Sequence, residues 1–499
     1  MRQWVLIAVL LSIFSGKLEA QYLWVLPLPY PIDYLEKLPP AEVEELKKDE
    51  EIEESPTTEF RKLLPPDFKS QKALGYTYGE TFGVPEGLKA QVDFWKKIYS
   101  KFSNTEYVIH DSKYMFIYRV VDVSDIMNRE GSYRSKSKLI SRRLGEHKRQ
   151  IRKLLREIHH KEHSKDSMND EEKKIYDVFK TIEDPARFLK ATLRDRIRSQ
   201  LGQREFFKQG IIWAGRYLPH LENIFNSERI PMEITRLPFV ESSFNIKARS
   251  KVGASGIWQF IRSTGKRFLK IDGAVDERND PIEATRAAAK LLKYNFELLQ
   301  NWPLALTAYN HGPAGMARAV KKLGTTDLVN IINDYKSSTF GFASKNFYAS
   351  FLGALQVEVE YEKYFGTLEP EAPMTYEEVP MKDYISTKAL MNHTKLSLQE
   401  LKRYNPGLMS SVFSGRKFIP KSYVLKLPQG MKETFLSSYQ TIPKEWVRRN
   451  QSKQIYHRVR HGDTLLYLAK RYNTTVQAIR ELNNIGKVIY HGQVLVIPR

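Results

Sequence analysis

The stretch ITRLPFVESSFNIKARSKVGASGIWQF, residues 234–260, decides the fold of the central part of this chain. Its apolar residues Ile234, Leu237 and Val240 recur at helical spacing, which predicts a buried helix that ends near Glu241. Burial disfavours the charged form of a carboxyl group, so we expect a raised pKa for Glu241. A carboxylic acid that keeps its proton near neutral pH can protonate a glycosidic oxygen, which makes Glu241 a candidate general acid.

Three short motifs follow one another along this region: ESSF at 241–244, GIWQ at 256–259 and AYN at 308–310. Together with DERNDP at 276–281, they resemble the signature motifs of lytic murein transglycosylases, and most of all the membrane-bound lytic transglycosylase D type. The resemblance is specific because several separated motifs agree in order and spacing. It implies a helical, lysozyme-like catalytic domain of the SLT type, which we assign to residues 204–366.

The resemblance also implies a reaction with a single carboxylic acid. Ordinary glycosidases use two carboxyl groups, whereas the motifs here offer one obvious acid, Glu241. In lytic transglycosylases this acid protonates the oxygen between N-acetylmuramic acid and N-acetylglucosamine, and then acts as base on the 6-hydroxyl of the muramic acid. Attack from within the substrate has an entropic advantage, which explains why one carboxyl group can suffice. The implied product is a 1,6-anhydro sugar.

Four further residues are assigned to substrate binding by the same resemblance. Tyr309 would orient Glu241 or the substrate, although a role as a core tyrosine remains open. Amide side chains can both donate to and accept from sugar groups, and Asn310 could equally hold its own turn. The complete set is Ser250, Gln259, Tyr309 and Asn310.

The sequence departs from the family after the last motif. Many relatives carry Glu-Thr-Arg-x-Tyr there, whereas residues 343–347 of this chain read ASKNF and lack both the acid and the tyrosine hydroxyl. His311 also stands where relatives often have a small residue. These differences leave the substrate preference open.

The C-terminal part contains two unequal copies of one unit, at residues 367–430 and 455–499, because LQELKRYN at 398–405 aligns with VQAIRELN at 476–483. The second copy resembles a LysM domain, which implies a βααβ order and binding of chains that contain N-acetylglucosamine. The first copy lacks the Gly-Asp-Thr turn, which favours a degenerate, structural module, and residues 431–454 are predicted to be a linker. Asp463 and Thr464 could also cap a helix. The implied glycan-binding residues are Gly462, Asp463, Thr464, Leu465, Asn483 and Ile485.

The N-terminal region carries signals of export and of strong positive charge. Residues 1–20 have the pattern of a cleaved secretory signal peptide, and residues 21–90 are a Pro-rich and acidic linker. The net charge of +21 implies an anionic partner, and the absence of cysteine excludes disulfides and a lipoprotein anchor. We expect residues 91–203 to be a basic helical region of unknown role. Its basic face could contact a membrane or anionic wall components, or be simply solvated.

The sequence therefore predicts a mainly α protein, α+β overall, with a lysozyme-like helical domain followed by small βααβ modules of LysM type. We expect an exported, periplasmic enzyme that acts on peptidoglycan glycan strands, with no cofactor, no metal and no nucleic-acid partner. The cluster His159, His160 and His163 is interpreted as surface. A lysozyme-like hydrolase and a non-catalytic wall-binding scaffold remain as alternatives.

Overall fold

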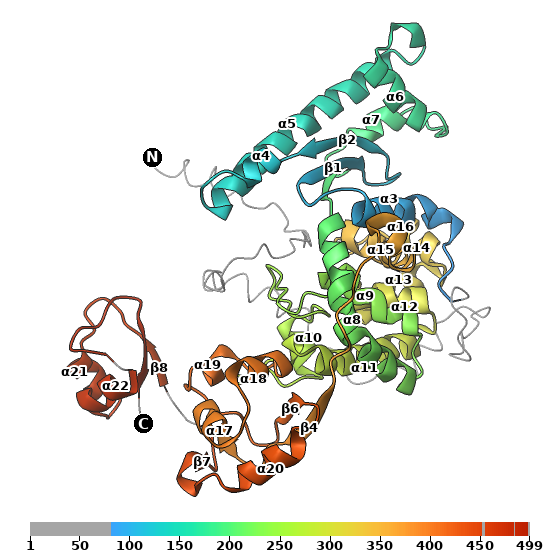
Figure 1. Cartoon of the computed structure of the whole chain (residues 1–499). Helices are drawn as coiled ribbons and strands as arrows, with labels where there is room; N and C mark the ends of the chain where they lie inside the picture. Colours follow the sequence, from blue (N-terminus) through green and yellow to red (C-terminus); the bar gives the residue numbers. More distant parts are fainter. Residues whose placement is uncertain (1–80, 452–454, 484, 498–499) are drawn as a thin grey trace. The chain divides into compact units, whose positions relative to one another are not determined.

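The computed structural model of the chain describes residues 81–451, 455–483 and 485–497. The predicted signal peptide and most of the predicted linker over residues 21–90 lie outside this range. Helices dominate and the strands are short, so the predicted mainly α fold is confirmed (Figure 1). The chain divides into two compact units, Met1–Ser250 with Ala288–Ala372, and Lys251–Ala287 with Pro373–Arg499. No helix in the described part is both long and apolar enough to cross a membrane.

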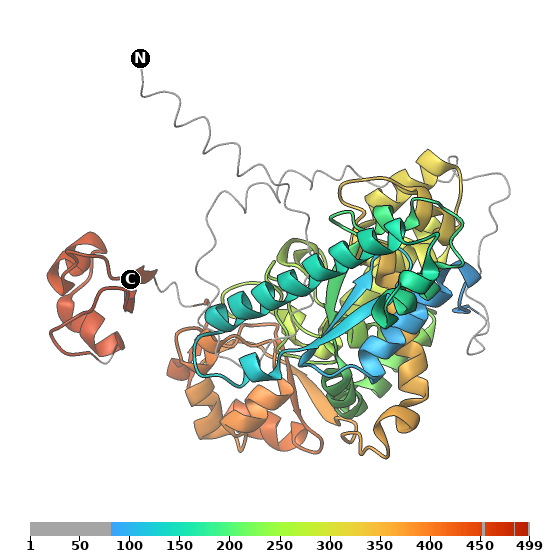
Figure 2. The same cartoon turned by 90° about the horizontal axis from the view of Figure 1, so that it is seen from above.

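The basic region is not purely helical, which corrects the prediction for residues 91–203. It contains an antiparallel sheet in the order β2-β1-β3, formed by β1 (Glu106–Asp111), β2 (Ile117–Asp122) and β3 (Ile197–Leu201). Aromatic and β-branched residues such as Tyr107, Val108 and Ile109 favour strands over helices. The long helix α5 (Tyr133–His160) packs on this sheet, as both views show (Figures 1 and 2). Shorter helices complete this part: α4 (Ser124–Met127), η2 (Lys165–Ser167), α6 (Asp170–Phe179) and α7 (Arg187–Ala191).

The helical part of the first unit surrounds α15 (Phe342–Val359), whose side chains are buried along most of its length. Helix α3 (Lys89–Ser100) packs along α15, so this helical part begins well before residue 204. Phe82 and Leu88 are also buried, which places residues 81–90 in folded structure where a linker was expected. The other elements are η1 (Glu86–Leu88), α8 (Arg204–Ser227), η3 (Met232–Arg236), α9 (Leu237–Ser242), α12 (Trp302–His311), α13 (Pro313–Leu323), α14 (Leu328–Asp334) and α16 (Tyr361–Phe365). Helix α11 (Pro281–Leu299) has residues in both units.

The second unit contains the first C-terminal copy, in which β4 (Tyr376–Pro380) pairs with β6 (Val424–Pro428). Its core also includes Ala274 and Val275 from the segment 251–287. The stretch 431–454, expected to be a linker, instead contains α20 (Lys432–Gln440) and β7 (Val447–Arg448), because Phe435 and Ile442 join the same apolar core. The remaining elements are α10 (Arg262–Lys266), η4 (Glu277–Asn279), β5 (Tyr384–Ile385), α17 (Thr387–His393), α18 (Leu398–Tyr404), α19 (Ser410–Phe413) and η5 (Lys444–Trp446).

The last copy has the predicted βααβ order: β8 (Ile455–Arg458), α21 (Leu465–Arg471), α22 (Val476–Asn483) and β9 (Val494–Ile497). Strands β8 and β9 pair antiparallel, and both helices contribute to one small apolar core. The two copies also share a paired hydrogen bond, in which an asparagine at the end of the second helix holds the last strand. Asn483 makes this pair with Val496, and Asn405 makes it with Lys426. The shared bond supports the internal repeat.

Candidate active site

Glu241 is the penultimate residue of the short helix α9, as its periodicity predicted. The helix ends because Ser243 and Phe244 adopt positive φ angles of 49° and 56° and turn the chain away. Helix α8 lies against this turn at Gly210, where an added Cβ would stand 2.9 Å from the carbonyl oxygen of Ser243. Phe239, two residues before Glu241, stacks on Phe207 of α8 with ring centroids 4.7 Å apart. Aromatic packing and a tight turn therefore fix the position of the acid.

The carboxyl group of Glu241 is packed by protein atoms, yet its side chain keeps partial exposure. Burial raises its pKa from 4.5 to about 8. Burial alone causes this rise in pKa, because no charge among the described residues contributes to it. At neutral pH Glu241 is therefore protonated and still accessible, as a general acid must be.

Helix α12 delivers Tyr309 and Asn310, near its C-terminal end, to the same region. Tyr309 lies close enough to Glu241 that the charge of the carboxylate, added to burial, holds the pKa of the phenol well above its usual range. The Oδ1 atom of Asn310 accepts a hydrogen bond of 2.9 Å from the hydroxyl of Ser344. Ser344 belongs to the altered stretch 343–347, which therefore still supports a residue of the site although it lacks the family's acid and tyrosine.

Tyr99 of α3 is a neighbour of Glu241 that sequence reasoning missed. Its ring lies 5.1 Å from that of Phe207, and the charge of Glu241 contributes, after burial, to a raised pKa of the phenol. The hydroxyl of Tyr99 is hydrogen-bonded to Ser350, whose own hydroxyl donates to the carbonyl oxygen of Phe347 at 2.7 Å. The bond to Ser350 lowers the pKa of the phenol, against the larger, opposite effect of burial. No motif marks α3; the one signal is the aromatic pair Trp95 and Tyr99, one helical turn apart.

His311, the unusual neighbour of Asn310, does not supply a second acid. Burial, with a contribution from the charge of Arg318, lowers its pKa from 6.5 to about 4. The ring packs edge-on against Phe340 at a centroid distance of 4.9 Å. His311 is therefore neutral at physiological pH and acts as a packing residue at the end of α12.

The remaining predicted substrate residues lie on loops. Ser250 follows α9 and is partly exposed. It belongs to the first unit, as do Glu241, Tyr309 and Asn310. Gln259 belongs to the second unit, has a φ of 48°, and donates from Nε2 to the carbonyl oxygen of Gly256 at 2.7 Å. Trp258, the third residue of the GIWQ motif, is fully buried, and its indole donates to Thr285 at 2.8 Å, so it is a packing residue.

The residues predicted to bind glycan in the last copy also build that module. Asp463 accepts a hydrogen bond from the Arg460 amide at 2.6 Å and pairs with His457, while Thr464 caps α21 through the Tyr467 amide. The side chain of Asn483 donates to the backbone carbonyls of Ile479 in its own helix and Val496 in β9, and it accepts from the Val496 amide. Leu465 and Ile485 pack in or against the core, and Gly462 has a φ of 87°. Glycan binding by these six residues stays a prediction.

Two domain families match parts of this chain. Residues 222–332 match the transglycosylase SLT domain family, and residues 457–498 match the LysM domain family. The chain is 26% identical over 317 residues to "Membrane-bound lytic murein transglycosylase D" of Escherichia coli strain K12, which covers 61% of this chain and 69% of that protein. It is 32% identical over 112 residues to a "Putative tributyltin chloride resistance protein" of Alteromonas sp. strain M-1, over 22% of this chain and 54% of that one.

Among solved structures, the lytic transglycosylase Slt of Pseudomonas aeruginosa is similar at 18% identity and a TM-score of 0.22, over 31% of this chain and 24% of that one. The family matches enclose the candidate acid: the SLT match contains Glu241, Gln259, Tyr309 and Asn310, and the LysM match contains the predicted glycan residues. This protein is therefore a lytic transglycosylase with an SLT catalytic domain and a C-terminal LysM domain.

Proposed function

We propose that this protein is exported and cleaves the β-1,4 bond between N-acetylmuramic acid and N-acetylglucosamine in peptidoglycan without water, leaving 1,6-anhydro ends. The observation that carries the proposal is the state of Glu241. Its pKa of about 8 is set by burial alone, with no contribution from a second carboxylate among the described residues. A hydrolase of the usual kind would place a second carboxyl group across the scissile bond.

The reaction needs Glu241 twice. Its proton passes to the glycosidic oxygen as the bond from that oxygen to the muramic acid C1 breaks, which leaves Glu241 ionised. The 6-hydroxyl of the same sugar then attacks C1 and returns its proton to Glu241. The enzyme therefore ends in its starting protonation state, and no water is consumed. The nearby hydroxyl of Tyr309 supports the site while Glu241 is charged, because a phenol can donate a hydrogen bond to a carboxylate.

The other predicted residues bind the glycan. Asn310, held by Ser344, and Gln259 offer amides that can bond to hydroxyl and acetamido groups. Ser250 would assist at the acetamido group of the reacting sugar. The LysM domain would tether the enzyme to the wall, which raises the effective concentration of substrate at the catalytic domain.

Digestion of purified peptidoglycan, with products identified by mass spectrometry, tests the proposal. We expect anhydro-muropeptides from the wild-type protein and none from Glu241→Gln, which keeps the shape of the side chain but has no acidic proton. Reducing ends in place of anhydro ends would show hydrolysis. Wall binding without any product from the wild-type protein would instead support a non-catalytic scaffold.

A further inference from the structure

We infer that the first C-terminal copy together with the folded stretch that follows it, residues 376–448, serves as a brace for the loop that carries Gln259 and does not bind glycan. We call it the brace module. The inference rests on the proposed function only for the role of Gln259 in substrate binding. All contacts that carry it lie within the second unit.

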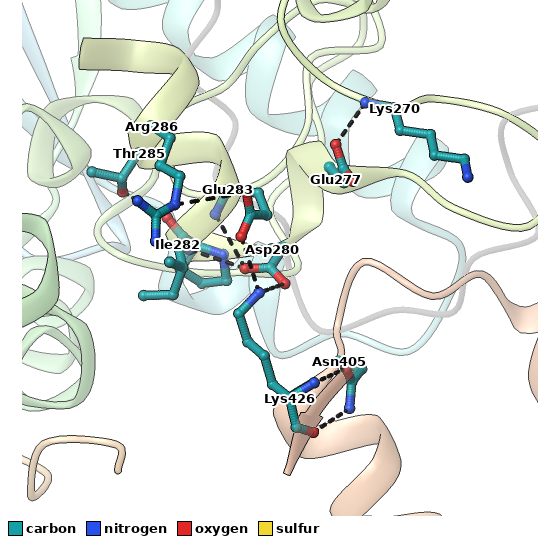
Figure 3. A network of polar contacts seen from close by, with 10 residues as sticks. Lys270, Glu277, Asp280, Ile282, Glu283, Thr285, Arg286, Asn405 and Lys426 are labelled. Carbon is teal, nitrogen blue, oxygen red and sulfur yellow. Dashed lines mark hydrogen bonds and ion pairs between the residues drawn. The ribbon is translucent and has the colours of Figure 1, made fainter. Parts of the chain in front are cut away.

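The two copies carry different kinds of residue at one equivalent position of their last strands. The asparagine pair that holds the last strand makes Lys426 of the brace module equivalent to Val496 of the LysM domain. Val496 is buried in the LysM domain. Lys426 instead extends its side chain to the start of α11, where its Nζ lies 2.9 Å from Asp280 and 3.3 Å from Glu283 (Figure 3).

This ion pair is buried and specific. The side chains of Lys426 and Asp280 are 2% and 3% exposed. Burial alone would lower the pKa of the lysine, but the carboxylates of Asp280 and Glu283 outweigh it and raise the pKa. Asp280 also caps α11 by accepting from the amides of Ile282 and Glu283. A buried lysine that stays charged stabilises the packing of the brace module on this end of α11, because removing either partner would leave an uncompensated charge in the interior.

The brace module also has a longer loop before its last strand, residues 405–423 with the short helix α19, against the described residues 485–493 in the LysM domain. This loop bonds to the segment 273–276. The carbonyl of Gly407 accepts from the Asp276 amide at 2.7 Å, and Leu408 forms a β-bridge with Val275. The hydroxyl of Ser411 donates to the carbonyl of Gly273 at 2.5 Å. In the LysM domain the position equivalent to Gly407 is Ile485, one of the residues predicted to bind glycan. In the brace module the segment 273–276 bonds at this position instead.

The segment 273–276 is linked in turn, through Asp276 and Arg278, to the loop that carries Gln259. The carboxylate of Asp276 makes a bidentate pair with Arg278, whose Nη1 donates to the carbonyls of Gly253 and Phe260 at 2.8 and 3.1 Å. At Gly256 the loop passes so close that a Cβ would stand 1.7 Å from the carbonyl oxygen of Arg278. Gln259 has a positive φ, a backbone conformation that persists where surrounding contacts enforce it.

The test compares Lys426→Met with Lys293→Met in the full chain. Lys293 lies further along the same helix α11 and makes a solvent-exposed ion pair of 2.9 Å with Glu228, so it controls for loss of a lysine charge. Hydrogen exchange of the amides at residues 253–260 and the kinetics on a short soluble glycan oligosaccharide are measured. For Lys426→Met alone we expect faster exchange at 253–260 and a KM raised by about tenfold with little change in kcat, because the loop positions substrate.

Ser411→Ala, which removes one hydrogen bond from a partly exposed residue, keeps the test informative if Lys426→Met does not fold. It should give the same changes at smaller size, and Lys426→Arg should restore exchange toward the wild-type rate. Unchanged exchange at 253–260 in both Lys426→Met and Ser411→Ala would overturn the brace. Loss of wall binding with an unchanged loop would also overturn it and would assign glycan binding to this copy. Failure of the proposed function would be recognised separately, as the absence of product from the wild-type protein. Hydrogen exchange at residues 253–260 would still test the brace in that case.

Discussion

At the residue scale, the protonation state of Glu241 is the property on which catalysis depends. The side chain sits at the end of a short helix whose Phe239 stacks on Phe207, and burial raises its pKa from 4.5 to about 8. A group with a raised pKa keeps its proton as the pH increases through the neutral range and loses it only near the higher value. The enzyme would therefore hold the acid form over the pH range in which most carboxyl groups are ionised.

The pH dependence of kcat/KM on a soluble glycan should report this group in the free enzyme. Because the first step needs the protonated form of Glu241, activity should fall as the pH rises past about 8. The measurement is kcat/KM from pH 5 to 10, with circular dichroism at each pH as a control for folding. A decline that begins near pH 5 in a folded enzyme would contradict a buried acid.

The hydrogen bond between Tyr99 and Ser350 should influence the pKa of Glu241. In Ser350→Ala the phenol loses this hydrogen-bond partner and is free to turn toward Glu241 and donate to its charged form, so the alkaline limit of kcat/KM should move down by about one pH unit. The double variant Tyr99→Phe with Ser350→Ala has no such donor and serves as the control. Equal limits in the single and double variants would show that Tyr99 acts on Glu241 by packing alone.

At the element scale, helix α5 presents a basic face to solvent while its apolar residues pack on the sheet. Its charged side includes Arg142 and Arg149, which are exposed and have no ion-pair partner among the described residues. A row of exposed cations on one helix attracts anionic polymers, and peptidoglycan carries carboxylates on its peptides. The positions of this row are Arg134, Lys138, Arg142, Arg149 and Arg156, while the neighbouring Lys153 pairs with Glu157.

We expect Arg142→Gln with Arg149→Gln to weaken cosedimentation with purified peptidoglycan at low salt by severalfold, and to have little effect at high salt, where charges are screened. The pair Lys321→Gln with Lys322→Gln, on the exposed side of α13, removes the same charge elsewhere and is the control. Equal weakening by both pairs would point to net charge, and not to α5, as the cause.

At the scale of the whole molecule, two copies of one fold have separate expected tasks. The LysM domain forms its own small core, while the core of the brace module is shared with the segment 251–287. A module with its own core can act as a tether, whereas a module that shares its core with its neighbour is part of the catalytic scaffold.

A chain that ends at residue 451 lacks the LysM domain and should separate these tasks. We expect it to keep its kcat/KM on short soluble oligosaccharides and to lose about tenfold or more of its rate on insoluble walls, because tethering acts through effective concentration. Full-length Glu241→Gln, which should still bind walls, is the control for binding without turnover. Equal loss on both substrates would show that the LysM domain supports the catalytic fold.

The sequence alone determined the local features of this protein. Helix α9 with its acid and the βααβ order of the last copy were predicted because periodicity, caps and turns act over a few residues. The sheet of the basic region and the folded stretch 431–448 were missed. Their strands and α20 depend on partners that short-range patterns do not identify.

Only the tertiary structure decided which distant residues meet. Tyr99 reaches the surroundings of Glu241 because α3 packs on α15, and Lys426 reaches Asp280, 146 positions away in sequence, because the brace module shares a core with the segment 251–287. Ser344 likewise supports Asn310 from a stretch that has lost the family pattern. Such pairs depend on the packing of whole elements, which is set by burial of apolar surface and leaves little trace in local sequence.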